Sequence, residues 1–418
     1  MTHDHTDRKR ICVVTAGHLS TCPRMLKAAD ALAEAGYEVR VVSARYTDWA
    51  WQADQDVRRT RSWKWTLVNY DRRQGTTKYF RSGVRFRSAK FLAKFAGPSR
   101  CPIGLAANAY SRAHAELLQA ILSEPQDLIY GGTSGALACM TAAAKRTGIP
   151  AALDLEDLYS DRSAPGRLED ALAELIESTV LPRAAFLTAG SAAIGEAYRR
   201  KYGVCAVPLH NTFPLPNAAP DLTPSQGQGL RLYWFGQTIG EGRGIETVVH
   251  AMGRARIPGE IHFRGRAVPR YVESLNLLAA AVAPRLKVMV HEPAPPEMMV
   301  ALCKPYDIGL ATEPGSEGNN AILLSNKALT YPLAGLPVAI TDTPGQHAFA
   351  MDLAEGAILF KPGDVDALAA GLKRWADDKC LLVRAKAAAW DAAKRRWHWE
   401  HPLERGALLR AVAAVFQQ

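Results

Sequence analysis

Short apolar runs alternate with helical patterns along most of this 418-residue chain. Between the apolar runs 11–16 and 38–43, the stretch 22–36 places Met25 and Leu32 on one helical face. Apolar runs of this length are typical of strands buried on both faces of a parallel sheet, and the helices between them wrap it. We expect strands near 11–16, 38–43, 127–130, 150–154, 185–188 and 204–207, and a second series near 231–235, 260–264, 286–290, 307–310, 337–340 and 357–360.

A linker separates these two series. Residues 209–229 are rich in Pro, Asn, Ser and Gly, as is typical of a connector between domains. A chain of this length is also expected to divide into two domains, each with its own core. The pattern predicts an N-terminal domain over 1–210 and a second domain over 211–385.

The composition limits the class of protein to which the chain can belong. Hydrophobic residues make up 48% of the chain and charged residues 22%, and no run approaches twenty apolar residues. We therefore expect a soluble globular protein without a spanning helix. The first ten residues are polar and lack the apolar region of a signal peptide, which favours the cytoplasm. The seven cysteines are scattered without a Cys-x-x-Cys pair, which argues against a disulfide framework or a zinc site.

One segment is strongly basic. Residues 57–100 contain thirteen Arg or Lys residues against one acid, Asp71, in a chain of net charge +10. Three interpretations are open: a solvated insertion whose aromatics pack on the domain, a contact with an anionic membrane or a lipid-linked acceptor, or a nucleic-acid surface. The last is disfavoured because no recognised nucleic-acid module accompanies the charge. Within the segment, one helical stripe is apolar and consists of Phe80, Val84, Phe91 and Phe95. Cations flank this stripe.

The stretch 325–342 predicts an N-capped helix that runs into a buried strand. Ser325 is a favoured N-cap, and Gly335 ends the helix. Lys327 lies in the first turn, where a cation opposes the helix dipole unless an anion lies nearby. The pattern therefore predicts a phosphate or diphosphate site at this helix start.

These segments, in this order, resemble a GT-B glycosyltransferase, specifically family 4 of the retaining nucleotide-sugar glycosyltransferases. The resemblance implies two Rossmann-like doubly wound domains facing across a cleft, with C-terminal helices over 386–418 that pack back on the first domain. It also implies a UDP- or GDP-linked sugar donor, an acceptor hydroxyl, retention and no metal. The motifs that carry it are Ser20 to Ala29, Tyr233-Trp234-Phe235-Gly236, Gly242-Arg243-Gly244-Ile245-Glu246, Asp307-Ile308-Gly309-Leu310 and 325–342.

On the donor side, the resemblance assigns the leaving diphosphate to two cations, Arg243 and Lys327. Two positions depart from the family pattern: Gln237 stands where an arginine is common, and Thr330 stands where a glutamate holds the donor ribose. Further residues expected to bind the donor are Gly17, Gly236, Gln237, Glu313, Asn319, Ser325, Asn326 and Thr330.

On the acceptor side, Glu156 and Asp157 end a strand and are expected to orient or deprotonate the acceptor hydroxyl. Arg24 either faces the ligand or forms a structural salt bridge with Asp154, Glu156 or Asp157. The chain has no histidine directly after strand 127–130, where relatives often carry one. The residues expected to lie on the acceptor side are His18, Arg24, Thr133 and Ser134.

The sequence leaves two alternatives to a glycosyltransferase. A sugar-nucleotide epimerase shares the fold, and fold alone does not fix function. A non-catalytic nucleotide-binding partner is compatible with the departures at Gln237 and Thr330. The expected partners are a nucleotide sugar, a glycan, lipid-linked or small-molecule acceptor, and an anionic membrane surface through 57–100, with no nucleic acid. Localisation is then cytoplasmic, or peripheral on the inner face of the membrane.

Overall fold

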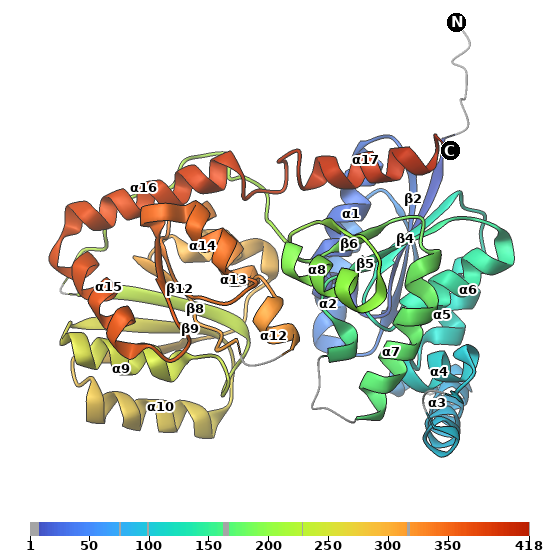
Figure 1. Ribbon diagram of the computed structural model, residues 1–418, viewed down its shortest axis with the longest axis horizontal. Coiled ribbons are helices and arrows are strands. Elements are labelled where there is room, and N and C mark those ends of the chain that lie inside the picture. Colours follow the sequence, from blue (N-terminus) through green and yellow to red (C-terminus); the bar gives the residue numbers. More distant parts are fainter. Residues whose placement is uncertain are drawn as a thin grey trace, which may run out of the picture. The chain divides into compact units, whose positions relative to one another are not determined.

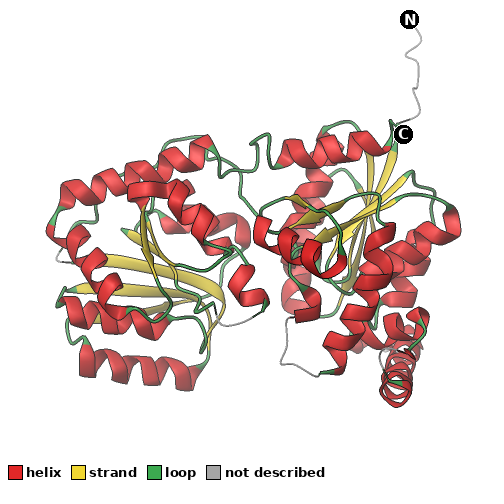
Figure 2. Cartoon of the chain, in the orientation of Figure 1, coloured by secondary structure: helices red, strands yellow, loops and turns green. Residues whose placement is uncertain are grey.

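The chain divides into two compact units in a computed structural model that describes residues 8–74, 77–97, 100–161, 167–227, 229–315 and 318–417 (Figure 1). Unit 1 comprises residues 1–209 and 405–418, and unit 2 comprises residues 210–404. Helices cover both faces of each parallel sheet (Figure 2), which is why the central strands read as continuous apolar runs.

Unit 1 holds a parallel sheet in the order β3-β2-β1-β4-β5-β6-β7. The sequence predicted every one of these strands except β3. The strands are β1 (Arg10–Thr15), β2 (Glu38–Arg45), β3 (Lys64–Asn69), β4 (Leu128–Gly132), β5 (Ala151–Leu155), β6 (Leu187–Ala189) and β7 (Val207–Pro208). The helices are α1 (Pro23–Glu34), α2 (Asp48–Arg59), α3 (Thr77–Ala96), α4 (Ile103–Tyr110), α5 (His114–Leu122), α6 (Leu137–Thr147), α7 (Leu168–Val180), α8 (Ala192–Tyr202) and α17 (Arg405–Val415).

The strand β3 corrects the prediction that 57–100 is one insertion. It pairs in parallel with β2. The indole N–H of Trp65 in this strand donates to Ser43, and that of Trp63 just before the strand donates to Asp30. The strand lies at the sheet edge and is only half buried. Because it contains polar residues, it does not form an apolar run in the sequence. Only the part from α3 onward is an addition to the sheet.

Unit 2 holds a second parallel sheet in the order β10-β9-β8-β11-β12-β13, and all six strands were predicted. They are β8 (Leu230–Ile239), β9 (Gly259–Ala267), β10 (Leu286–His291), β11 (Ile308–Ala311), β12 (Val338–Thr341) and β13 (Ala357–Phe360). The helices are α9 (Ile245–Ala255), α10 (Pro269–Val282), α11 (Met299–Cys303), α12 (Asn319–Ile322), α13 (Asn326–Thr330), α14 (His347–Leu353), α15 (Val365–Asp377) and α16 (Lys379–Arg395).

The end of the chain divides between the units. Residues 386–404, which include most of α16, stay in unit 2, and only 405–418 join unit 1, where α17 packs on α1. Inside unit 2, the buried carboxylate of Glu404 accepts hydrogen bonds from His210 N at 2.7 Å and His210 Nδ1 at 2.8 Å. Burial alone would raise the pKa of Glu404, but His210 and Arg396 hold that pKa below its ordinary value. One buried carboxylate thus ties the first residue of unit 2 to its last.

A buried ion pair fixes the interior of unit 1. Arg24 Nε donates to Asp154 Oδ2 at 2.7 Å, and Arg24 Nη1 donates to the carbonyl oxygen of Leu209. Burial alone would lower the pKa of Arg24, but Asp154 raises it above its ordinary value. The pair therefore links α1, β5 and the end of the sheet. No helix in the part of the chain that the structure describes is long and apolar enough to span a membrane.

We predict that Asp154→Asn destabilises unit 1 by about 3–5 kcal/mol, because it leaves the Arg24 charge buried without a counter-ion. The matched control is Asp127→Asn, whose partner Arg10 is 40% exposed, and it should cost less than about 1 kcal/mol. Urea unfolding followed by circular dichroism measures both. Equal losses of unfolding free energy in the two variants would show that the buried pair stabilises the unit no more than the exposed pair does.

Candidate functional site

In each unit the strand order reverses at one point. In unit 2 the chain runs outward from β8 through β9 to β10 and then returns to β11 on the other side of β8. In unit 1 the corresponding point lies between β1 and β4. The loops at the carboxyl ends of such a strand pair run in opposite directions, which is where open α/β sheets bind ligands. The predicted site residues concentrate in the loops at these two points.

In unit 2, Lys327 forms an ion pair with Glu313. Lys327 Nζ contacts Glu313 Oε1 and lies 5.3 Å from the ring centroid of Trp234. Both side chains are largely buried, with 12% and 10% exposure. The sequence predicted an anion near Lys327, and in this structure the anion is a carboxylate from the loop after β11. Sequence reasoning did not identify Trp234 as part of this site.

The predicted N-cap at Ser325 is only partly correct. Ser325 occupies the N-cap position of α13, but its hydroxyl makes no capping hydrogen bond and donates to Glu313 Oε1 at 3.3 Å. The helix is five residues long, so its dipole is small, and Gly335 ends the following turn at a φ of 71°. Charge at this site therefore comes mainly from Lys327 and Glu313 rather than from the helix start.

The loop that carries Arg243 is fixed to the loop that carries Glu313. Thr312 Oγ1 donates to the carbonyl oxygen of Arg243 at 2.9 Å. The next residue, Gly244, has a φ of 69°, and a Cβ there would lie 1.9 Å from the carbonyl oxygen of Thr312. Glycine is therefore required for this close approach. The contact joins the carboxyl ends of β8 and β11 and places the two loops side by side, with the Arg243 side chain exposed.

Gly236 and Gln237 belong to β8 rather than to a loop after it. The register of β8 with β9 shifts between Phe235 and Thr238, which is an irregularity at this pair of residues. A Cβ on Gly236 would lie 2.6 Å from the ring of Trp234, so glycine makes room for the indole that lies near Lys327. Gln237 is exposed on the same irregular segment.

Several buried polar atoms around Glu313 lack partners among the described residues. They are Glu313 Oε2, Thr343 Oγ1 and Gln346 Oε1. The surrounding loop is nevertheless well held, because Thr341 Oγ1 donates to the carbonyl oxygen of Glu313 at 2.7 Å and Gln346 Nε2 donates to Thr341 Oγ1 at 2.9 Å. Buried polar atoms without partners are rare in folded proteins, and a ligand or water is a common reason for them. No motif in the sequence pointed to Thr341, Thr343 or Gln346.

The other predicted donor residues differ in exposure. Thr330 is completely buried, and its hydroxyl donates to the carbonyl oxygen of Asn326 at 2.8 Å, so it faces the interior. The side chain of Asn326 is exposed at the start of α13. Asn319 begins α12 and is buried. The structure thus groups Lys327, Glu313 and Ser325 directly, whereas the hydroxyl of Thr330 is bound to the backbone of its own helix.

In unit 1, Thr133 joins the two loops at the reversal point. Thr133 Oγ1 accepts a hydrogen bond from Ala16 N at 3.0 Å. Its φ is 69°, a left-handed conformation that a β-branched residue rarely adopts. Such strain persists only where the surroundings impose it, and it concentrates at functional sites. Ser134 follows it half buried, and a Cβ on Gly17 would meet no atom within 4 Å, so the glycine leaves open space beside this loop.

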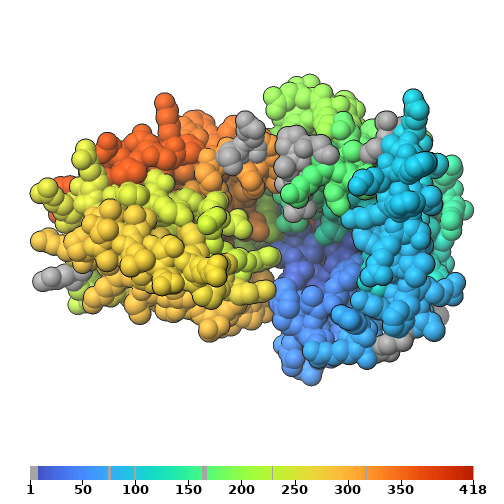
Figure 3. Space-filling model, turned by 90° about the horizontal axis from the view of Figure 1, so that it is seen from below, coloured from blue at the N-terminus to red at the C-terminus, as the bar shows by residue number. Residues whose placement is uncertain are grey.

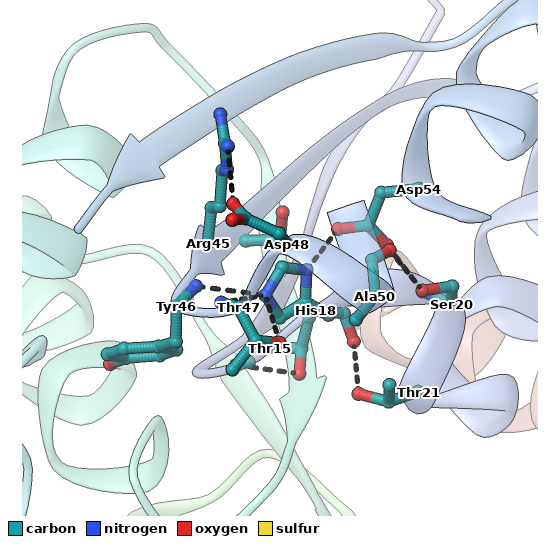
Figure 4. A network of polar contacts seen from close by, with 12 residues as sticks. Thr15, His18, Ser20, Thr21, Arg45, Tyr46, Thr47, Asp48, Ala50 and Asp54 are labelled. Carbon is teal, nitrogen blue, oxygen red and sulfur yellow. Dashed lines mark hydrogen bonds and ion pairs between the residues drawn. The ribbon is translucent and has the colours of Figure 1, made fainter. Parts of the chain in front are cut away.

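His18 holds the loop after β1 in place (Figure 4). Its Nδ1 lies 2.6 Å from Asp54 Oδ2, and its Nε2 accepts hydrogen bonds from Tyr46 N and Thr47 N at 2.9 and 3.0 Å. Asp54 also accepts from Ser20 N at 2.8 Å. Both ring nitrogens are engaged and the side chain is 5% exposed. This geometry makes His18 a positioning residue of the loop.

The remaining acceptor-side residues flank the end of β5. The buried bidentate contact of Arg24 with Asp154 favours the salt-bridge alternative over contact with a ligand. Glu156 and Asp157 are half buried directly after the strand. Their backbones are fixed, because Glu156 N donates to the Tyr159 hydroxyl at 3.3 Å and the carbonyl oxygen of Asp157 accepts from the Tyr198 hydroxyl at 3.0 Å. Among the described residues, no three His, Cys, Asp or Glu side chains cluster as metal ligands would.

Comparison with known proteins gives a family match and similar folds. Residues 23–218 match the glycosyl transferase 4-like domain. HepE from Anabaena, solved with UDP and glucose, is 14% identical with a TM-score of 0.63, covering 98% of this chain and 100% of that chain. Sucrose-phosphate synthase from Thermosynechococcus elongatus is 15% identical with a TM-score of 0.67, covering 98% and 99%. A TarM variant from S. aureus is 8% identical with a TM-score of 0.66, covering 98% and 100%. No curated protein sequence matches the chain.

The two parallel α/β units are those of the GT-B fold, and residues 23–218 carry a glycosyl transferase 4-like domain. The resemblance indicated by the sequence is confirmed. The fold and this domain are similar to those of glycosyltransferases.

We predict that Thr133→Val destabilises unit 1 by about 1 kcal/mol or more, because it keeps the branched shape but removes the acceptor for the Ala16 N–H group. Thr133→Ser keeps the hydroxyl and removes the methyl group that disfavours the left-handed backbone, so it should be at least as stable as the parent. Thermal unfolding and amide exchange at Ala16 measure both. Similar losses in the two variants would contradict a role for this hydrogen bond.

Proposed function

We propose that the protein transfers a glycosyl group from a nucleoside-diphosphate sugar to an acceptor hydroxyl, with retention and without a metal ion. The observation that carries this proposal is the Lys327–Glu313 pair, which lies with the Arg243 loop where the strand order of unit 2 reverses. A donor diphosphate needs cations at such a point, and this chain offers two from adjacent loops.

The pair has a chemical consequence for donor binding. Lys327 is held in position by Glu313 and by the Trp234 ring, so it is ordered before a ligand arrives. A diphosphate oxygen would replace Glu313 as the partner of the Lys327 ammonium group. Glu313 would then accept a hydrogen bond from a hydroxyl group of the sugar donor. Glu313 Oε2, which has no partner among the described residues, already offers an acceptor for one. Glu313 in this role substitutes for the glutamate that Thr330 replaces.

The proposed glycosyl transfer needs no metal ion to account for the bonds, the proton and the charge. The bond between the anomeric carbon and the diphosphate oxygen breaks, and the acceptor oxygen bonds to the same face of that carbon. The acceptor proton passes to an oxygen of the leaving diphosphate. Lys327 and Arg243 stabilise the negative charge that develops on this leaving group, which requires charge and position rather than a covalent catalyst.

For the acceptor, we place a hydroxyl of a glycan, a lipid-linked sugar or a small molecule at the reversal point of unit 1. Support comes from the strained Thr133 and from the half-buried Glu156 and Asp157 after β5. Relatives give support on substrate class, because HepE was solved with UDP-glucose and a TarM variant with UDP and α-GlcNAc-glycerol. We therefore propose a UDP- or GDP-linked donor and a role in glycan biosynthesis.

The direct test uses donor hydrolysis, which needs no known acceptor. We expect slow release of UDP from UDP-glucose or of GDP from GDP-mannose, in the presence of a chelator, with the anomeric configuration of the donor in the first sugar released. Proton NMR of the anomeric signal measures this before mutarotation. Inversion would contradict retention, and conversion of the nucleotide sugar into an epimer would show that the chain is an epimerase.

Replacing the proposed diphosphate cation should affect turnover more than fold. We predict that Lys327→Gln lowers donor turnover about a hundredfold or more, because the leaving diphosphate loses a preorganised cation. The control is Lys304→Gln, which removes an exposed lysine of the same unit and should leave turnover unchanged. Titration calorimetry with the nucleoside diphosphate separates binding from chemistry. Unchanged turnover in a folded Lys327→Gln protein would contradict the proposal that Lys327 stabilises the leaving diphosphate.

A further inference from the structure

The net charge of the chain lies entirely in unit 1. Residues 1–209 and 405–418 contain 31 Lys or Arg residues against 21 Asp or Glu, whereas residues 210–404 contain 20 of each. The largest excess within unit 1 falls on α3, which has six cations and no acid. A surface of this kind attracts an anionic partner.

The helix α3 packs on unit 1 through small residues. Its buried positions are Ser82, Ala89 and Ala93, and α4 is the helix that it packs against. Arg112 reinforces the contact, because its Nε donates to Ser82 Oγ at 3.0 Å. The fully buried residues of α3 are therefore small, with Phe86 half buried beside them, and burial of that face does not account for the exposed phenylalanines Phe80, Phe91 and Phe95.

The opposite face of α3 is apolar and exposed, as the predicted stripe indicated. Phe80, Val84, Phe91 and Phe95 are 64%, 63%, 71% and 89% exposed. At 100° per residue they fall within about 60° of one another, along about 22 Å of helix. Figure 3 shows the blue to cyan residues of this region standing at the surface of unit 1. Isolated exposed apolar residues are ordinary, but a continuous stripe marks an interaction surface.

Five of the six cations of α3 fall into two sets. Arg85 pairs with Glu116, and Lys90 pairs with Glu169 at 2.7 Å, so these two serve the fold. The exposed cations Arg81, Arg87 and Lys94 flank the apolar stripe, Arg87 and Lys94 on one side and Arg81 on the other. A phenylalanine stripe between exposed cations is the pattern of a helix that lies in the interface of a membrane.

We infer that α3 docks unit 1 on an anionic lipid bilayer, with the phenyl rings of the stripe in the interfacial region and the flanking cations at the phosphate groups. Charge favours this occupant over a second copy of the chain, because two α3 helices would bring cations together without a single acid. The inference does not depend on the proposed sugar transfer. It extends that proposal by placing the acceptor side of the enzyme at a membrane surface.

The test is co-sedimentation of the full chain with vesicles. We expect binding to vesicles in which about a third of the lipid is phosphatidylglycerol, weaker binding in added salt because screening shortens the reach of the charges, and little binding to phosphatidylcholine alone. The apolar variant combines Phe80→Ser, Phe91→Ser and Phe95→Ser. We expect it to bind at least about tenfold more weakly.

The charge variant combines Arg81→Gln, Arg87→Gln and Lys94→Gln, and it should also bind at least about tenfold more weakly. Its matched control carries Arg285→Gln, Lys287→Gln and Lys361→Gln, which remove three exposed cations from unit 2, and it should bind like the parent. Circular dichroism checks the fold of each variant. Donor hydrolysis should be unchanged in all of them, so this inference and the proposed function fail separately.

Three results would overturn the inference. The parent protein fails to sediment with anionic vesicles, or the α3 variants sediment as the parent does, or the matched control loses binding equally. A concentration-dependent dimer that disappears in the apolar variant, without vesicle binding, would assign the stripe to a second copy of the chain. Retardation of RNA by the parent, with no vesicle binding, would assign it to nucleic acid.

Discussion

The constraint on which the whole arrangement depends is the parallel pairing of strands in two separate sheets. Parallel strands need crossover helices, and these bring every carboxyl end to the same edge of the sheet. Where the order reverses, between β1 and β4 in unit 1 and between β8 and β11 in unit 2, the loops separate and leave room for a ligand. A hydrogen bond joins the two loops at each point, from Ala16 N to Thr133 Oγ1 in unit 1 and from Thr312 Oγ1 to the carbonyl oxygen of Arg243 in unit 2.

The ion pair of Lys327 and Glu313 shows how such a point can be ready for an anion and still be stable without one. A largely buried lysine without a counter-ion would be strongly unfavourable, and Glu313 supplies the counter-ion from a neighbouring loop. The same carboxylate keeps one oxygen without a partner among the described residues. If Lys327 changes its partner from the carboxylate to a diphosphate, its charge stays compensated throughout. The carboxylate of Glu313 would then accept a hydrogen bond from a hydroxyl group of the donor.

Much of the fold was predictable, because apolar runs in central strands reflect burial on both faces. The edge strand β3 was not, since none of its residues is fully buried, it begins with Lys64 and ends with Asn69, and Thr66 divides its apolar residues. For the site, the sequence predicted an anion near Lys327 but not that Glu313 provides it, because the pairing joins residues from different loops. Thr133 was selected for its position, whereas its left-handed backbone is a property of the folded loop alone. The pairing of His18 with Asp54 is likewise a tertiary contact that spacing along the chain does not contain, whereas the salt bridge of Arg24 with Asp154 was one of the two alternatives that the sequence left open.

The central claim is that unit 2 binds a nucleoside diphosphate where its strand order reverses. Hydrogen–deuterium exchange with mass spectrometry tests it most directly, with UDP and GDP as probes. The account predicts slower exchange in peptides that cover 240–244, 311–315 and 325–329, because the ligand orders the loops that carry Arg243, Glu313 and Lys327. Slower exchange elsewhere in the chain, with these three segments unchanged by a nucleotide that binds, would contradict it.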